Sequence, residues 1–135
     1  MTMGGMSLFG VAQRAMSAQL VRMNAASSNL ANAGSVTGTE SEAYRPIRAV
    51  FAERYDAATG LSTVDVSSVV RSAAAPVKQY NPQHPLADSE GHVWTAPVDE
   101  SAEMVGMLDA SRQYQNLVEA LSTAKQLMLE TMRMK

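Results

Sequence analysis

Two histidines and a carboxylate have the residue types and the spacing of a candidate metal site. His84, Asp88 and His92 recur every four residues within the segment NPQHPLADSEGHVW. Imidazole nitrogens and carboxylate oxygens are common ligands of zinc and related metals. The segment carries an Asn-Pro pair, a second proline and Gly91, which favour loop and tight turn over a helix or strand that could fix the ligands. We therefore favour two exposed loop histidines, with Asp88 capping a turn before Gly91, and expect no metal site.

The rest of the sequence offers no other reactive cluster. The chain has no cysteine, so it has neither disulfides nor a thiolate nucleophile. Its serines have no histidine placed to activate them, and no G-x-S-x-G elbow occurs. Phosphate-binding and dinucleotide-binding glycine motifs are also missing from the sequence. We therefore expect a protein that is not an enzyme, with no cofactor and no small-molecule substrate.

The length and the charge of the chain exclude further classes of protein. The chain has 135 residues and a net charge of −2, which suits one domain with a modest core. Charges of both signs are scattered, without the basic stripe of a nucleic-acid-binding protein. No apolar run approaches the length of a membrane span. The start, MTMGGMSLFG, has no basic residue before its apolar part, so we expect no ordinary secretory signal peptide.

The chain divides into three parts, because all five prolines lie between Pro46 and Pro97. We expect an N-terminal helix within 1–34, a β-rich and loop insert over 35–98, and a C-terminal helix within 99–135. In the first part, apolar residues recur at helical spacings, namely Phe9, Ala12, Met16, Leu20, Met23, Ala26 and Leu30. The last part gives a similar stripe, namely Met104, Leu108, Ser111, Tyr114, Val118, Leu121, Met128 and Met132. Asp99 or Ser101 is the expected N-cap, and Asn32 with Gly34 the expected stop of the first helix.

The middle part is typical of short strands. IRAVF and STVDVSSVV are rich in β-branched residues, DAATG supplies a turn ending at Gly60, and a short strand is expected at Val93 and Trp94. The predicted fold is therefore mainly α with a small β-rich insert. The two long terminal helices are expected to form a coiled-coil-like pair, with Met16 and Met23 near the stripe of Tyr114, Leu121 and Met128.

The end of the first helix has an unusual composition. NAASSNLANAGSVTG sets Asn24, Asn29 and Asn32 among alanines and serines. These side chains either solvate a fraying helix end, or fix the register where helices from separate chains pack closely. On the second interpretation, Leu at position 29 or 32 would leave the stability of the monomer nearly unchanged and impair assembly.

Three segments, in order, resemble the proximal rod proteins of the bacterial flagellar axial family. ASSNLANAGSVTG and EAYRP are similar to the N-terminal signature, with Ser27, Leu30, Ala31 and Asn32 before Tyr44-Arg45. YNPQHPLADSEGHV resembles the middle segment of these proteins, and EMVGMLDASRQYQNLVEALSTAKQLMLETM resembles their C-terminal helix. TAPVDES departs from the family by lacking an asparagine, and MTMGGM has no counterpart.

The resemblance implies a structural subunit that is exported unfolded by the flagellar type III apparatus and assembles helically into the rod. This rod spans the periplasm in the flagellar basal body and transmits torque to hook and filament, with the terminal helices inside and the insert outside. Implied partners are further copies of the chain, the rod proteins FlgB, FlgF and FlgG, the hook-basal-body protein FliE and the export apparatus. A cytoplasmic helical adaptor or export chaperone is the alternative. The expected assembly interface comprises Asn24, Ser27, Asn29, Leu30, Ala31, Asn32, Met104, Arg112, Tyr114, Asn116, Leu121 and Met128.

Overall fold

Along the chain, two long helices flank a β-rich middle in the computed structural model, which describes residues 7–134. The segment MTMGGM, for which no family counterpart was found, lies outside the described residues. The elements are α1 (Leu8–Ala31), β1 (Val36–Thr37), a 3-10 turn (Glu40–Glu42), β2 (Ile47–Asp56), β3 (Leu61–Arg71), β4 (Val77–Tyr80), β5 (His92–Thr95) and α2 (Glu100–Arg133). Within the described residues, neither helix has a stretch apolar and long enough to cross a bilayer.

The ends of both helices follow from local side chains. The Ser7 hydroxyl accepts a hydrogen bond from the Gly10 amide at 3.0 Å, which caps the start of α1. Asp99, one of the two N-caps predicted for α2, is the observed cap, and it accepts from the Ala102 amide at 3.2 Å. Asn32 is the C-cap of α1, but its φ of −107° is not left-handed. The left-handed stop expected at Asn32 and Gly34 is therefore absent; among residues 7–134, only Gly60 and Gly91 have positive φ.

Strands β2 and β3 form a long antiparallel hairpin, so the strands and the turn predicted there are confirmed. They pair from Ile47↔Arg71 to Asp56↔Leu61, with an irregularity between Val50 and Phe51. Gly60 closes the turn at a φ of 73°, a conformation that glycine adopts without a steric penalty. The hairpin is longer than the sequence indicated, because β2 continues through polar residues to Asp56.

A second sheet has the strand order β1-β5-β4, and both of its pairings are antiparallel. The short strand predicted at Val93 and Trp94 is confirmed as β5. Gly91 precedes it at a φ of 82°, and a Cβ there would lie 3.0 Å from atoms of both Pro82 and Tyr80. Only glycine fits this turn without strain, so the loop over 81–91 is closed tightly against β4.

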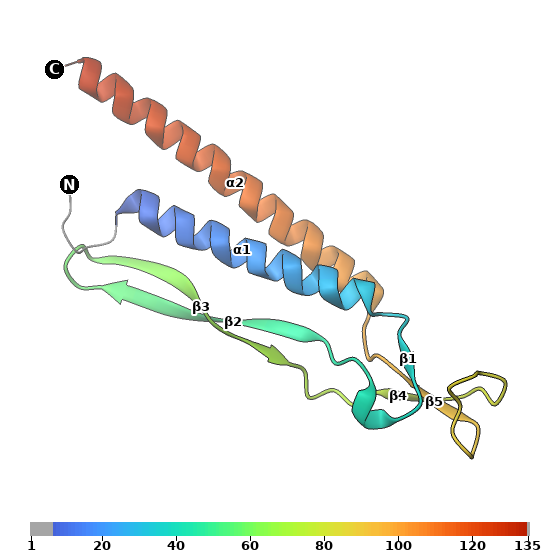
Figure 1. The fold of residues 1–135 in the computed structure, drawn as a ribbon. Coiled ribbons are helices and arrows are strands. Elements are labelled where there is room, and N and C mark those ends of the chain that lie inside the picture. Colours follow the sequence, from blue (N-terminus) through green and yellow to red (C-terminus); the bar gives the residue numbers. More distant parts are fainter. Residues whose placement is uncertain (1–6, 135) are drawn as a thin grey trace.

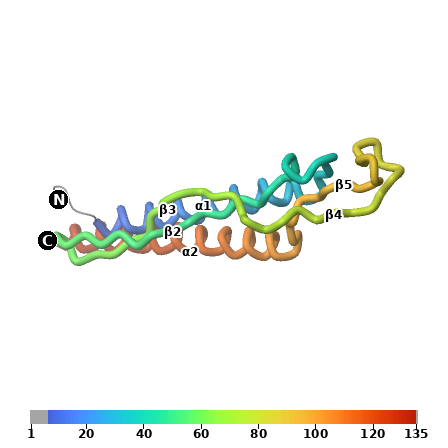
Figure 2. The backbone as a smooth tube through the Cα atoms, turned by 90° about the horizontal axis from the view of Figure 1, so that it is seen from below, coloured from blue at the N-terminus to red at the C-terminus, as the bar shows by residue number. Residues whose placement is uncertain are grey.

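Helix α1 lies between α2 and the β2–β3 hairpin, and the small sheet extends beyond one end of these three layers (Figure 1). Seen from below, the molecule is long and narrow (Figure 2). The fully or nearly fully buried apolar side chains are small. Among the described residues they are Ala18, Ala25, Ala26, Ala43, Val93, Ala96 and Ala110, together with Pro46 and Pro76. Because alanines line the contacts of α1 and α2, the backbones of these layers approach closely.

The predicted fold class, mainly α with a small β-rich insert and a coiled-coil-like pair of terminal helices, is wrong. Strands make up 24% of the structure and build two sheets, so the middle is no minor insert. Helix α1 packs against β2 and β3 as well as against α2. The first turns of α1, at Phe9 and Ala12, face Leu121 and Ala124, so Met128 lies beyond the start of α1.

The stripe predicted for α2 coincides only in part with the observed contact face. Ser111, Tyr114 and Leu121 are half-buried, but the first part of the stripe lies outside it. Met104 and Leu108 are 56% and 67% exposed, whereas Glu103 and Ala110 are buried. Residues spaced by seven share one side of a helix, so Glu103 and Ala110 define the inward face. The physical reason is that the first turns of α2 bury Glu103 and the small side chain of Ala110 on this face, which leaves Met104 and Leu108 outside.

Candidate assembly interface

The Asn29 side chain joins three elements at one end of the helices. Its Oδ1 accepts from the Ile47 amide at 2.9 Å and from the Tyr44 hydroxyl at 2.8 Å. Its Nδ2 donates to the Ile47 carbonyl at 3.0 Å and to Glu103 Oε1 at 3.1 Å. Asn29 has no exposed surface. The interpretation that this side chain solvates a fraying helix end is therefore wrong for Asn29, because protein groups occupy its donors and acceptor.

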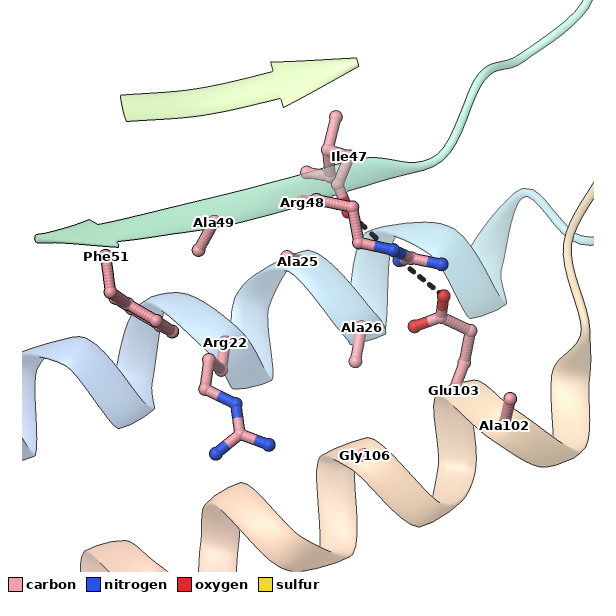
Figure 3. Close-up of a pocket in the computed structure, with 10 residues that line it drawn as sticks. All are labelled: Arg22, Ala25, Ala26, Ile47, Arg48, Ala49, Phe51, Ala102, Glu103 and Gly106. Carbon is pink, nitrogen blue, oxygen red and sulfur yellow. Dashed lines mark hydrogen bonds and ion pairs between the residues drawn. The ribbon is translucent and has the colours of Figure 1, made fainter. Parts of the chain in front are cut away.

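Glu103 carries a buried carboxylate beside Asn29. It is 6% exposed, and its Oε1 lies 2.6 Å from Arg48 Nη1. An uncompensated buried charge is costly, but this carboxylate has both a cation and an amide donor. Arg48 also donates to the Ile47 carbonyl from the same Nη1 atom (Figure 3). The start of β2 is thus tied to both helices through one polar cluster that sequence spacing does not reveal.

A groove of about 260 Å³ opens next to this cluster, between α1, β2 and α2 (Figure 3). Its walls are mostly small or apolar, and two arginines stand at its rim. Arg22 donates to Asp109 at 3.0 Å and to Gln19 at 2.7 Å. The lining residues are Arg22, Ala25, Ala26, Ile47, Arg48, Ala49, Phe51, Ala102, Glu103 and Gly106. We refer to this feature as the groove.

The predicted interface residues do not share one environment. Asn24, Ser27, Ala31, Met104, Arg112, Asn116 and Met128 are exposed, and Leu30, Asn32, Tyr114 and Leu121 are half-buried. The Asn32 amide donates to the Ser28 carbonyl at 2.9 Å, so it caps its own helix. The structure brings Asn24, Ser27 and Ala31 together on one exposed side of α1. Whether these positions contact a neighbouring chain remains a prediction.

The exposed side of α1 continues beyond the residues singled out from the sequence. Positions spaced alternately by four and three are all exposed, namely Gln13, Ser17, Leu20, Asn24, Ser27 and Ala31. This spacing matches the seam of a helix that packs against another helix. This spacing can be seen in the sequence, but hydrophobic periodicity singled out the more apolar stripe of α1 instead.

An ion pair fixes α1 on the hairpin. Arg14 Nη1 lies 2.7 Å from Asp65 Oδ1, and Arg54 is 3.5 Å from the other carboxylate oxygen. The hydrogen bond from Arg14 holds the pKa of Asp65 below its usual range. Arg14 and Asp65 are 51 positions apart, so neither their ion pair nor the lowered pKa of Asp65 could be predicted from the local sequence.

The expectation of two exposed loop histidines is wrong, because both are half-buried and His92 is the first residue of β5. The loop before β5 is organised around Asp88. Its Oδ1 accepts from the amides of Glu90 and His92, at 2.9 Å and 2.8 Å, which confirms the predicted turn cap. The His92 amide, with a smaller contribution from the Glu90 amide, holds the pKa of Asp88 below its usual range. His84 Nδ1 accepts from the Leu86 amide at 3.0 Å. Within residues 7–134, no three His, Asp or Glu side chains are grouped so that they could hold a metal ion.

Comparisons with known proteins show to which protein family the chain belongs. Residues 9–38 match the family model described as flagella basal body rod protein, and residues 89–134 match that of the flagellar basal body rod FlgEFG protein C-terminal region. The chain is 45% identical over 129 residues to the flagellar basal-body rod protein FlgC of Salmonella typhimurium, covering 94% of this chain and 95% of the relative. It is 39% identical over 127 residues to FlgC of Yersinia enterocolitica, with the same coverage. The resemblance noted from sequence motifs is confirmed, and the chain belongs to the FlgC family of flagellar basal-body rod proteins.

Proposed function

We propose that this chain builds the rod by packing side by side with its neighbours through helix faces that its own fold leaves uncovered. As a member of the FlgC family it is a structural subunit of the flagellar basal body and not an enzyme. The alternative, a cytoplasmic adaptor or export chaperone, has no support from relatives matched over 94% of the chain.

The observation that carries this proposal is the exposure of large apolar side chains along α2. The exposed set is Met104, Val105, Leu108, Val118, Leu127, Met128, Leu129 and Met132. Large apolar side chains left exposed in this number on one helix indicate a surface used for protein association. Methionines suit such a face because their flexible side chains adapt to neighbours that differ. A rod subunit that meets both copies of itself and other rod proteins has this requirement.

The exposed seam of α1 supports a second helix contact. Asn24, Ser27 and Ala31 are small or can hydrogen-bond, so another helix can approach closely there. We propose that segments 1–34 and 99–135 form the core of the rod and that 35–98 lies outside it. The proposed partners are further copies of the chain, FlgB, FlgF, FlgG and FliE, in the part of the basal body that crosses the periplasm.

The first experiment replaces Leu108 with Gln in a strain that lacks the chromosomal gene. Without complementation, we expect non-motile cells whose purified basal bodies have no rod. The free energy of unfolding of the Leu108→Gln subunit is expected to stay within about 0.5 kcal/mol of the wild-type value, because the site is exposed. Cells with this variant are nevertheless expected to form smaller swimming zones in soft agar. Fewer of their purified basal bodies should carry a rod.

The matched control is Leu86→Gln, which changes an exposed leucine in the loop over 81–91. It is expected to swim close to wild type. Normal swimming of the Leu108→Gln strain would contradict the use of this face of α2. A full rod in the gene-deletion strain would contradict the proposed function itself.

We further propose that export through the flagellar type III apparatus depends on the N-terminal segment rather than on the middle of the chain. This proposal rests on the family membership. Deleting residues 2–31 should reduce the secreted protein at least tenfold while the cellular amount persists. Deleting residues 57–59, in the hairpin turn, serves as the control and should preserve secretion. Undiminished secretion of the first variant would refute the proposal.

A further inference from the structure

A pocket of about 360 Å³ lies at the open end of the β2–β3 hairpin. The 3-10 turn, the segment over 43–45 that leads into β2, and the last residue of β3 contribute its walls. It shares no lining residue with the groove. We call it the arginine pocket, and its lining residues are Ser41, Glu42, Ala43, Tyr44, Arg45 and Arg71.

The arginine pocket carries positive charge that no carboxylate neutralises. The ion pairs of the described residues use the guanidinium groups of Arg14, Arg22, Arg48 and Arg54. Arg45 and Arg71 take part in none of these pairs. Glu42 also lines the pocket, and within residues 7–134 it forms no ion pair with either arginine. Two arginines and one glutamate give the pocket a net charge of +1.

Arg71 is held in one orientation by its neighbours. Its Nη1 donates to the Arg45 carbonyl at 2.9 Å, and its guanidinium carbon lies 5.3 Å from the centre of the Tyr44 ring. The Tyr44 hydroxyl in turn donates to Asn29 Oδ1 at 2.8 Å. A guanidinium has five N–H donors, so Arg71 keeps free donors after this one bond. Donors that are already in place reduce the entropy lost when a ligand binds.

Arg45 adds a second guanidinium that the subunit itself does not use. Within residues 7–134, its side chain forms neither a hydrogen bond nor an ion pair, although it is half-buried. A cation that is partly withdrawn from water gains free energy when an anion pairs with it. No polar contact of the described subunit therefore depends on the Arg45 side chain, and an anion in the pocket would supply the partner that it lacks.

We propose that the arginine pocket binds the carboxylate of an Asp or Glu side chain from a neighbouring protein in the basal body. The inference rests on the proposed function, since it names the chemistry by which a rod subunit holds a neighbour. Guanidinium groups pair with carboxylates through two parallel N–H···O bonds. The net charge of +1 suits a carboxylate better than a phosphate monoester, which carries about −1.5 to −2.

The first test measures this chemistry on the purified full-length subunit. Heteronuclear NMR follows the Nε–H signal of Arg71 as sodium acetate is added, with sodium chloride at equal ionic strength as the reference. We expect acetate alone to move the signal until it saturates, and the Arg45→Gln subunit to bind acetate about fivefold more weakly or worse. An equal response to chloride, or undiminished binding by Arg45→Gln, would overturn the proposal. Tighter binding of sodium phosphate than of acetate would overturn the choice of a carboxylate.

The second test asks whether the arginine pocket is used in the rod. Arg45→Gln removes the charge, and Arg45→Lys keeps the charge without the planar fork of donors. Both subunits should keep the wild-type midpoint in urea, because the side chain makes no polar contact in the described subunit. We expect Arg45→Gln to shrink swimming zones in soft agar at least twofold and Arg45→Lys to give an intermediate size. If Arg45→Gln lowers the urea midpoint, Ser41→Glu replaces it, since a second carboxylate in the pocket should cause the same losses.

Arg54→Gln is the matched control. Arg54 is an exposed arginine of β2 outside the pocket, and Asp65 keeps its closer partner Arg14 at 2.7 Å. This variant should swim like wild type, and an equal loss in both arginine variants would overturn the proposal by showing a general sensitivity to surface charge. Normal swimming of Arg45→Gln would refute the docking of a neighbour at this pocket and leave the proposed function intact. A full rod in the gene-deletion strain would instead refute the proposed function.

Discussion

Replacing Asn29 with Leu is expected to lower the free energy of unfolding by about 2–3 kcal/mol. Leucine is close to asparagine in shape but offers neither donor nor acceptor. The Ile47 amide would lose its acceptor at 2.9 Å, and Glu103 would lose the carboxamide donor at 3.1 Å. Each buried group left without a partner costs about 1–3 kcal/mol. Arg48 still neutralises Glu103, and Ser28 still lies 2.9 Å from the Tyr44 hydroxyl, which limits the loss.

Urea denaturation of the purified subunit measures this effect, and Asn24→Leu is the matched control. It makes the same chemical change five positions earlier in α1, where the side chain is exposed. Asn24→Leu should lower the free energy of unfolding by no more than about 0.5 kcal/mol. Equal midpoints for Asn29→Leu and Asn24→Leu would contradict the buried cluster and restore the idea that Asn29 acts only in assembly.

The Asn29 result also separates folding from assembly at this helix end. The sequence led us to expect that Asn29 and Asn32 act in assembly with little effect on monomer stability. The structure instead closes the Asn29 side chain inside the subunit, while Asn24, Ser27 and Ala31 remain outside. Any loss of motility in an Asn29 variant would therefore reflect a less stable subunit, whereas an Asn24 variant would test assembly itself.

Features governed by neighbouring residues were predictable from the sequence. The Asp99 cap depends on a side chain and an amide three residues apart, and the Gly60 turn depends on one residue that tolerates positive φ. The Asp88 turn is equally local. In each case, the chemistry that decides the structure lies within a few positions, so the pattern alone indicates it.

Features decided by distant partners were not predictable in this way. Asn29 meets Ile47 and Glu103, which are 18 and 74 positions away. The inward face of the first part of α2 was missed because hydrophobic periodicity ranks Met104 and Leu108 above Glu103, Gly106 and Ala110. That ranking holds when a helix buries its largest apolar side chains. It fails here because α2 meets α1 through small residues, and a subunit made for assembly keeps large apolar groups outside.

The same close packing makes Ala110→Leu the second substitution with a large expected effect. Ala110 has no exposed surface, and it lies seven positions after Glu103, on the face of α2 that meets α1. Protein interiors are close-packed, so three additional carbon atoms must displace a neighbour. Overpacking of this kind typically costs about 1–3 kcal/mol, and we expect the free energy of unfolding to fall by that amount.

Ala120→Leu is the control, because it makes the same change at an exposed position of α2. Ala120 borders an open pocket beside the first turns of α1, so the added carbon atoms displace no neighbour. Leucine and alanine both have high helix propensity, so the helix itself is little affected in either variant. Urea denaturation should therefore separate the two variants by more than about 1 kcal/mol. If Ala110→Leu is as stable as Ala120→Leu, α1 and α2 are not in close contact at Ala110. The groove would then lose its geometry as well, because Gly106 and Glu103 form its α2 wall on that same face.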